Sequence, residues 1–198
     1  MKIYMIRHSI TSGNKRHAYI GATDEPLCEE GIELLKERMY PEVEMVIASP
    51  MKRCIQTSMC IYPDKKPYVI DDLKECDFGA FEGMTYEELK ENVDYQEWLT
   101  KEGKIPFPQG EDQLEFRKRC VKGFEEAVEY IHNRNIQNVA MIVHGGTIMA
   151  VLEAYAKPQE NFYHWKVQNG EGYLVEVDDA SWFTKTVDRY VTVSEIIR

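Results

Sequence analysis

The stretch "MIVHGGTIMA" (residues 141–150) places a histidine between two apolar patterns. The apolar run before it predicts a buried strand over 138–143, and the pattern after its two glycines predicts a helix over 147–156. An ionisable ring at the end of a buried strand is either an inert polar cap or part of a site. The rest of the sequence has to decide between these two interpretations of His144.

The N-terminal residues repeat this arrangement. "KIYMI" (2–6) predicts a buried strand, and Arg7 and His8 follow it directly. Further apolar runs predict strands over 44–49, 67–71, 172–177 and 184–193, the last of which alternates like an edge strand. Helical patterns cover 28–40, 51–62, 85–92 and 111–135. Strands that alternate with helices indicate an α/β protein with a mostly parallel sheet.

Composition limits the classes of protein that fit. The 198 residues carry a net charge of −10, which argues against nucleic acid as the main partner, because binding it needs a concentrated basic face. Five cysteines without a C-x-x-C pair favour reduced thiols. The apolar runs are too short for a signal peptide or a membrane span. We expect one soluble, cytoplasmic domain over residues 1–198 without membrane association; the sequence gives no oligomeric state.

Residues 93–110 fit neither a helical nor a strand period. They contain two prolines, two glycines and Trp98. A connection of this length in a compact domain is usually functional or disordered, so we expect a lid over a pocket in preference to a plain surface loop.

Functional groups gather at the carboxyl ends of parallel strands. The predicted strand ends supply two imidazoles, two guanidinium groups and a carboxyl group, from His8, His144, Arg7, Arg53 and Glu75. Each residue alone has a structural explanation, but together they suit one task. Two guanidinium forks and the free N–H groups of a helix that begins at Gly145 fit a phosphoryl group. A neutral imidazole is a nucleophile toward that group, and a protonated carboxyl can donate to the leaving alcohol.

Metal and nucleotide chemistry have weaker support. The chain lacks the H-E-x-x-H and H-x-H spacings of zinc sites, and two arginines beside the site would repel a cation. It also lacks G-x-x-x-x-G-K-[ST] and G-x-G-x-x-G, the phosphate-binding loops of nucleotide enzymes. We expect neither a metal nor a cofactor.

The order of these residues resembles the histidine phosphatase superfamily, also called the phosphoglycerate mutase-like family. "IRHSITSGN" is similar to its R-H-G-x-T-x-x-N signature, and "YIGATDEPLCEEGIE" to its G-x-x-D-x-P-L-x-x-x-G segment. "IASPMKRCIQTS", "LKECDFGAFEGMTYEEL" and "IVHGGTI" are similar to the S-x-x-x-R-x-x-Q-T, L-x-E-x-x-F-G-x-x-E-G and V-x-H-G-G blocks. The resemblance implies a three-layer α/β sandwich with helices on both faces, and a reaction that needs no metal and no nucleotide.

The resemblance also implies roles for the site residues. His8 is then the nucleophile that becomes phosphohistidine, and Glu75 is the proton donor to the leaving group and later the base toward water. The residues that complete the phosphate pocket are Arg7, Arg53, His144, Asn14, the backbone at Gly145, and Thr11.

One position departs from the motif, because Ser9 stands where the family usually has glycine. Glycine is favoured where backbones approach closely or φ is unusual, so the serine either shifts the first loop or places a hydroxyl near the pocket. The basic run "KRH" (15–17) is either a solvated turn or a cationic rim for an acidic substrate.

The phosphatase branch of the family fits better than the glycolytic mutases, which carry a longer basic insertion. In residues 93–110 the only cations are Lys101 and Lys104. We therefore expect a phosphomonoester hydrolase that acts on a small-molecule phosphate, with α-ribazole 5′-phosphate as the best single named substrate. A mutase-type phosphotransferase and a non-catalytic phosphate- or phosphopeptide-binding pseudophosphatase stay open as alternatives.

The expected substrate pocket draws on two groups of residues. Lys15, Gly21, Trp98 and Lys101 are candidates to contact the substrate. A set of aromatic residues either lines a pocket for a base or packs in the core and lid: Tyr19, Trp98, Phe107, Tyr163, His164 and Trp165.

Overall fold

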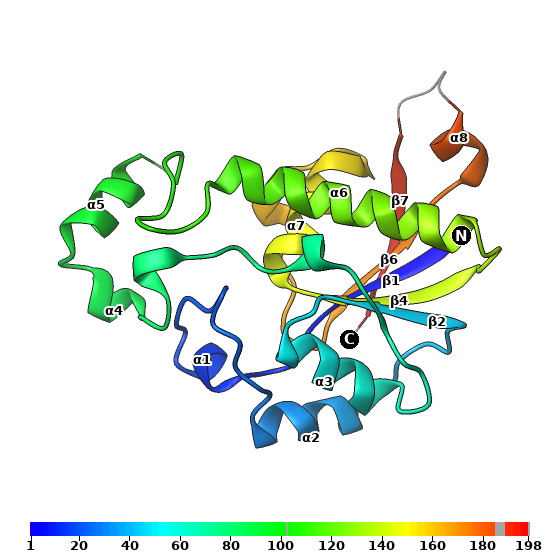
Figure 1. The fold of residues 1–198 in the computed structure, drawn as a ribbon, viewed down its shortest axis with the longest axis horizontal. Coiled ribbons are helices and arrows are strands. Elements are labelled where there is room, and N and C mark those ends of the chain that lie inside the picture. The colour runs from blue at the N-terminus through cyan, green and yellow to red at the C-terminus, as the bar shows by residue number, and fades with distance from the viewer. Residues whose placement is uncertain (102, 185–188, 198) are drawn as a thin grey trace.

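The computed structural model describes residues 1–101, 103–184 and 189–197, and its strands form one seven-stranded sheet in the order β3-β2-β4-β1-β6-β7-β5 (Figure 1). The strands are β1 (Lys2–Arg7), β2 (Met45–Ala48), β3 (Tyr68–Val69), β4 (Asn138–Val143), β5 (Ala156–Lys157), β6 (Gly172–Glu176) and β7 (Val191–Ile197). Strands β3, β2, β4 and β1 are parallel neighbours, and β6 runs antiparallel to both β1 and β7. The carboxyl ends of β1, β2, β3 and β4 therefore lie at the same end of the sheet.

Helices cover both faces of this sheet, as expected for a three-layer α/β sandwich (Figure 1). The α-helices are α1 (Ser12–Lys15), α2 (Glu29–Glu37), α3 (Lys52–Ile61), α4 (Tyr86–Leu89), α5 (Val93–Thr100), α6 (Gln113–His132), α7 (Gly145–Tyr155) and α8 (Asp179–Phe183). Short 3-10 helices are η1 (Asp71–Leu73), η2 (Gly79–Phe81) and η3 (Phe162–Trp165). Helices α6 and α7 lie on one face and α2 and α3 on the other, whereas α4 and α5 project beyond the end of the sheet.

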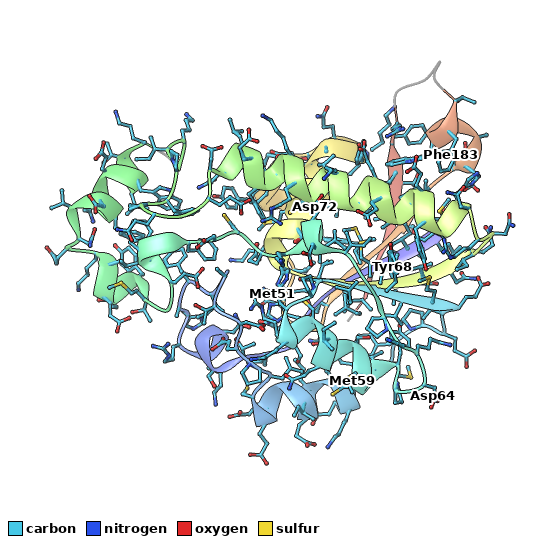
Figure 2. The ribbon with its side chains drawn as sticks, viewed as in Figure 1. Met51, Met59, Asp64, Tyr68, Asp72 and Phe183 are labelled. Atoms are coloured by element: carbon cyan, nitrogen blue, oxygen red, sulfur yellow. The ribbon has the colours of Figure 1, made fainter. Side chains whose placement is uncertain are left out.

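The sheet divides its side chains between two cores. Ile3 and Met5 of β1 pack with residues of α6 and α7, whereas Ile6 belongs to the cluster on the face of α3. A strand buried on both faces has no polar face, which is why β4 reads as a continuous apolar run in the sequence. Tyr68 of β3, labelled in Figure 2, extends the first core to the outer strand of the sheet. Its ring stacks on that of Tyr130 of α6, with 3.8 Å between the ring centroids.

A third apolar cluster lies beside the sheet and is rich in aromatic rings. Tyr95 of α5 is only 2% exposed and lies at its centre. Its ring is stacked on Trp98, with centroids 6.0 Å apart, and meets Phe81 edge-on at 5.3 Å. This packing holds α5 against η2.

The interpretation of 93–110 as an irregular loop was wrong for its first half, because α5 occupies Val93–Thr100. The side chain of Asn92 caps this helix by accepting a hydrogen bond from the Tyr95 N–H at 3.0 Å. Among its residues only Tyr95 is fully buried, and Val93 is 80% exposed, so the helix shows no apolar stripe. Movement of this segment as a lid stays a prediction.

The predicted edge strand over 184–193 was also misplaced. The strand observed is β7, Val191–Ile197, while residues 185–188 of the predicted one lie outside the described residues. Strand β7 lies between β6 and β5, so it is not an edge strand. The short β5, which the sequence placed at the end of a helix, pairs with Val191 and Thr192 only.

Thr85 and Glu88 form a capping box at the start of α4, within the helical pattern predicted over 85–92. All five cysteines are free thiols. Across residues 1–101, 103–184 and 189–197, no helix has the length and apolar character needed to cross a membrane.

Candidate active site

The carboxyl ends of β1, β2 and β4 bring the predicted polar residues together. Arg7 is the last residue of β1 and His8 follows it, whereas His144 follows β4 directly. The two imidazole centroids are 5.2 Å apart, and both rings are buried. Glu75 lies in the segment that follows β3 and the short helix η1.

The hydrogen bond of His8 defines its tautomer. Its Nδ1 lies 2.7 Å from the carbonyl oxygen of Ser9, which can only accept, so Nδ1 carries the proton and Nε2 keeps its lone pair. Burial lowers the pKa of His8 well below its usual value, and the charges of Arg53 and Arg7 lower it further. His8 is therefore a neutral imidazole with an available nitrogen.

His144 is held in a similar neutral state. Its Nε2 lies 2.8 Å from the hydroxyl of Ser49 and 3.5 Å from the thiol sulfur of Cys54. Burial lowers the pKa of His144 well below its usual value, and Arg53 and His8 add to this effect. A protonated His144 would place a positive charge where no solvent can stabilise it, so the neutral form is favoured.

The guanidinium groups of Arg7 and Arg53 are oriented by backbone carbonyls. Arg53 is fully buried and donates from Nη1 to the Thr23 oxygen at 2.9 Å and from Nη2 to the Gly21 oxygen at 2.8 Å. Arg7 donates from Nη1 to the Val167 oxygen at 2.8 Å. The buried Nε–H of each arginine has no acceptor among the described residues.

Within the described residues, neither of these two arginines forms an ion pair with a carboxylate, although the charge of Glu75 acts on Arg7. The arginine ion pairs within the described residues belong to Arg38, Arg117, Arg119 and Arg189. A buried cation without a counter-ion is strongly unfavourable, and an unpaired buried N–H costs a further ~1–3 kcal/mol. The two free Nε–H groups are therefore donors that an anion could satisfy.

Glu75 reaches the start of α7 through its carboxyl group. Oε1 accepts from the Cys76 N–H at 3.0 Å and Oε2 from the Gly146 N–H at 3.2 Å. Burial raises the pKa of Glu75 and outweighs these hydrogen bonds and the nearby arginines. A Cβ added at Gly146 would lie 2.3 Å from Oε1, so the glycine is needed for this approach.

Glu82, which the sequence analysis did not assign to the site, holds the loop that orients Arg53. Its carboxylate accepts from the N–H groups of Gly21 at 3.0 Å and Ala22 at 2.8 Å, and from the Thr23 hydroxyl at 2.6 Å. These bonds turn the carbonyl groups of Gly21 and Thr23 toward the guanidinium. The glutamate of the F-G-x-x-E-G block was the signal available in the sequence.

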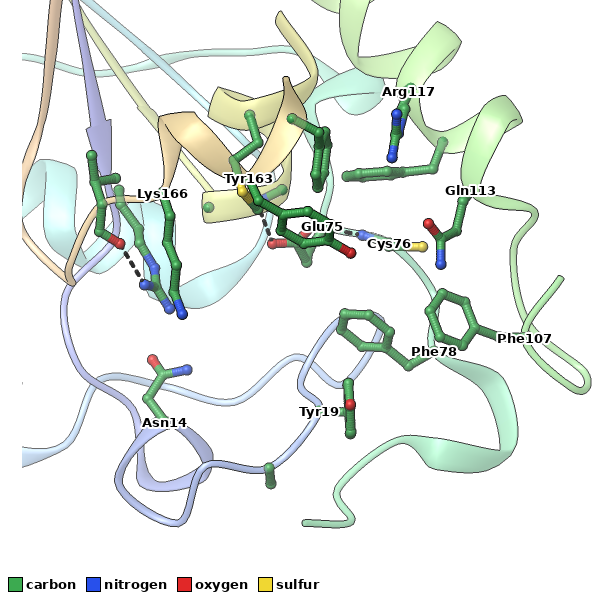
Figure 3. Close-up of a pocket in the computed structure, with 18 of the residues that line it drawn as sticks. Asn14, Tyr19, Glu75, Cys76, Phe78, Phe107, Gln113, Arg117, Tyr163 and Lys166 are labelled. Carbon is green, nitrogen blue, oxygen red and sulfur yellow. Dashed lines mark hydrogen bonds between the residues drawn. The ribbon is translucent and has the colours of Figure 1, made fainter. Parts of the chain in front are cut away.

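A cavity of about 540 Å³ adjoins the site (Figure 3). Arg7, Asn14, Glu75 and Gly145 line one end of it, where Arg7 precedes His8 in the chain and Gly145 follows His144. Seven aromatic residues form much of the remaining wall: Tyr19, Phe78, Trp98, Phe107, Phe116, Phe162 and Tyr163. Further polar side chains come from His17, Gln113, Arg117 and Lys166.

The structure brings most of the predicted phosphate-binding residues together, but Thr11 has another role. Its side chain is fully buried and caps α1 by accepting from the Asn14 N–H at 3.2 Å. It does not line the cavity. Asn14 does, and its side-chain oxygen accepts from the Thr11 N–H at 3.3 Å.

Three of the four substrate-pocket candidates lie elsewhere. Lys15 pairs with Glu30 on the surface. The Gly21 backbone is occupied by Glu82 and Arg53 and borders a separate cavity. Lys101 is exposed at the end of α5. Only Trp98 lines the main cavity, and of the run 15–17 only His17 does.

Four of the six predicted aromatic residues line the cavity: Tyr19, Trp98, Phe107 and Tyr163. Trp165 instead packs in the main core at 5% exposure, and His164 lies against its ring. Phe78, Phe116 and Phe162 also line the cavity and were not predicted, although Phe78 belongs to the F-G-x-x-E-G block.

Ser9 neither strains the first loop nor places its hydroxyl in the cavity. Its N–H donates to the Thr57 hydroxyl at 3.0 Å, and its own hydroxyl donates to the Gly31 oxygen at 2.6 Å. Its backbone φ is not positive. The serine therefore ties the loop to α2, on the side away from the cavity.

Within the described ranges, no group of three or more His, Cys, Asp or Glu side chains is arranged to hold a metal ion.

Proteins of known name and structure are similar to this chain over most of its length. The chain is 30% identical over 159 residues to a candidate phosphoserine phosphatase of Hydrogenobacter thermophilus, covering 76% of each chain. It is 24% identical to the adenosylcobalamin/α-ribazole phosphatase of Escherichia coli, covering 90% of this chain and 91% of that protein. The crystal structure of a candidate α-ribazole 5′-phosphate phosphatase from Escherichia coli superposes with a TM-score of 0.83 at 21% identity, covering 100% of this chain and 96% of that one.

A family model matches residues 3–189, which include every strand end and loop of the site. The chain therefore belongs to the histidine phosphatase superfamily, branch 1.

Proposed function

We propose that this protein is a phosphomonoester hydrolase in which His8 accepts the phosphoryl group. The observation that carries this proposal is a pair of guanidinium groups, of half-buried Arg7 and fully buried Arg53. Neither forms an ion pair among the described residues, and each has a buried Nε–H without an acceptor there. A phosphate monoester dianion supplies the missing charge and accepts from the free Nε–H groups. The N–H of Gly145, at the start of α7, adds a donor to the same anion.

The first chemical step follows from the protonation states. The Nε2 lone pair of His8 attacks phosphorus, and the bond from phosphorus to the leaving oxygen breaks. Glu75 donates its proton to that oxygen from its acid form, which burial favours by raising the pKa. The imidazole then carries a positive charge, which the bond from Nδ1–H to the Ser9 carbonyl stabilises.

The second step reverses these roles. Glu75, now a carboxylate, removes a proton from a water molecule that attacks phosphorus. The bond between phosphorus and Nε2 breaks, and His8 returns to its neutral form. His144 and the two arginines hold the phosphoryl oxygens throughout, so the chain's own residues account for the reaction without a metal ion.

The aromatic end of the cavity favours a leaving group with a flat ring. Tyr19, Phe78 and Trp98 supply ring faces and edges for stacking, and the volume of about 540 Å³ suits a nucleoside-sized molecule. Glu75 is the only carboxyl group in the lining of this cavity within the described residues, so the ammonium of phosphoserine has no counter-ion apart from the proton donor. These features support α-ribazole 5′-phosphate as the substrate.

Steady-state hydrolysis of p-nitrophenyl phosphate in the presence of a chelator tests the reaction class. Samples quenched in alkali, where phosphohistidine survives, should show one added phosphoryl group on the His8 peptide by mass spectrometry. Turnover that requires bisphosphoglycerate would indicate a phosphotransferase, and phosphate binding without turnover or adduct would indicate a pseudophosphatase. A comparison of kcat/KM for α-ribazole 5′-phosphate and phosphoserine then tests the substrate.

A further inference from the structure

A single amide side chain joins the nucleophile loop to the phosphate-binding loop. Asn169 lies between η3 and β6, and its Nδ2 is 3.0 Å from the His8 oxygen and 3.3 Å from the Ser9 oxygen. The same nitrogen is 3.0 Å from the side-chain oxygen of Asn14. All three partners accept hydrogen bonds, so the nitrogen of Asn169 has to face them.

The first consequence concerns the tautomer of His8. The Ser9 carbonyl accepts from His8 Nδ1 at 2.7 Å and from Asn169 at 3.3 Å. Asn169 therefore holds the acceptor that keeps the proton on Nδ1. A carbonyl free to rotate away would leave the proton distributed over both ring nitrogens, and Nε2 would lose its lone pair for part of the time.

The second consequence concerns the amide of Asn14. Its Oδ1 accepts from the Thr11 N–H, which is a fixed donor, and from Asn169. Its Nδ2 has no acceptor among the described residues, and Asn14 lines the cavity beside Lys166 (Figure 3). The amide thus presents N–H groups to an anion, and a reversed amide would present an oxygen.

We propose that Asn169 is a positioning residue of the site: it holds the Ser9 carbonyl that orients His8, and it directs the Asn14 N–H groups toward the phosphoryl group. Its effect on turnover rests on the proposed function. Its effect on the tautomer of His8 belongs to the resting protein and does not depend on turnover.

The test combines substitutions with a spectroscopic measurement. Asn169→Ala removes the donor, and Asn169→Asp keeps the shape but places oxygen against three acceptors. We expect kcat/KM to fall by roughly 10- to 100-fold for Ala and at least as much for Asp. In ¹⁵N NMR spectra of the resting enzyme, assigned with His8→Ala, the Nδ1–H tautomer of His8 should give way to a mixture in both variants.

Gln168→Ala is the matched control, because this neighbouring amide side chain is exposed and should leave kcat/KM and the spectrum unchanged. In an Asn14→Ala background, the Asn169→Ala effect should shrink, since part of it acts through Asn14. Folded Asn169 variants with kcat/KM within twofold of the wild type and an unchanged tautomer would overturn the proposal. If Ala fails to fold, Asp and the NMR measurement decide. Absence of a phosphoryl adduct in the wild type would instead refute the proposed function and leave the tautomer result to be judged by itself.

Discussion

The two ends of the cavity are built by different interactions. At the phosphate end polar backbone groups orient three of the side chains: His8 by one carbonyl, Arg53 by two carbonyls and Glu75 by two amides. At the aromatic end the rings orient one another, and the main polar link is the 2.8 Å hydrogen bond between the hydroxyls of Tyr19 and Tyr95. Directional bonds fix atoms for chemistry, whereas ring packing defines a shape. Substitutions at the first end should therefore act mainly on kcat, and those at the second mainly on KM.

The largest effect should come from His8→Ala, which removes the nitrogen that forms the covalent intermediate. We expect kcat for p-nitrophenyl phosphate to fall by ~10³-fold or more. His17→Ala is the control, because His17 lines the same cavity without contacting the buried rings, and it should stay within tenfold of the wild type. Residual activity of His8→Ala within tenfold would remove His8 from the nucleophilic role.

Arg53→Lys tests whether orientation by the two carbonyls matters beyond charge. A lysine keeps the positive charge but cannot bind the Gly21 and Thr23 oxygens and the phosphoryl group together. We expect a loss of about 10²-fold in kcat/KM, with weaker inhibition by inorganic phosphate. Arg16→Lys, an exposed arginine of the first loop, should change neither quantity. An unaffected Arg53→Lys enzyme would mean that charge alone holds the phosphoryl group.

Glu75→Gln should show a leaving-group dependence and a change in the pH profile. Burial raises the pKa of Glu75, so the acid form that donates the proton persists to higher pH and is lost as the pH rises through that raised value. Burial lowers the pKa of His8, so the neutral nucleophile is lost only at acidic pH. We expect kcat for alkyl phosphates to fall by ~10²-fold or more, and kcat for aryl phosphates to fall far less.

In the same variant the alkaline limb of kcat/KM against pH should disappear, while the acidic limb set by His8 remains. Equal slowing of alkyl and aryl phosphates, with both limbs intact, would assign Glu75 a structural role.

The contrast between the two ends of the cavity also explains which site residues could be predicted from the sequence. His8, His144, Arg7 and Arg53 follow or flank apolar runs, and parallel strands place their carboxyl ends at one edge, so their meeting could be expected before the structure was known. The place of Glu75 in the site could be predicted only from the family motif, because it depends on the turn after β3.

The residues of the aromatic end could not be predicted from strand ends. Phe78 precedes a 3-10 helix, Trp98 lies in a helix without an apolar stripe and Phe162 begins another 3-10 helix, so no local period relates them. Asn169 was missed for a similar reason: its three acceptors are 155–161 residues away along the chain, and only the sheet brings them near.

The smallest effect should come from the aromatic end itself, through Trp98→Leu. Trp98 stacks between Tyr95 and Phe107, with centroids at 6.0 and 5.0 Å, and lines the cavity. An aromatic contact is worth about 0.5–1.5 kcal/mol, so KM for an aromatic substrate such as α-ribazole 5′-phosphate should rise by roughly two- to twelvefold, with kcat for p-nitrophenyl phosphate unchanged. Lys101→Ala, at the end of the same helix but outside the cavity lining, should alter neither constant. A fall in kcat without a change in KM would show that ring packing at this end also orients the reacting groups, and the division between the two ends would fail.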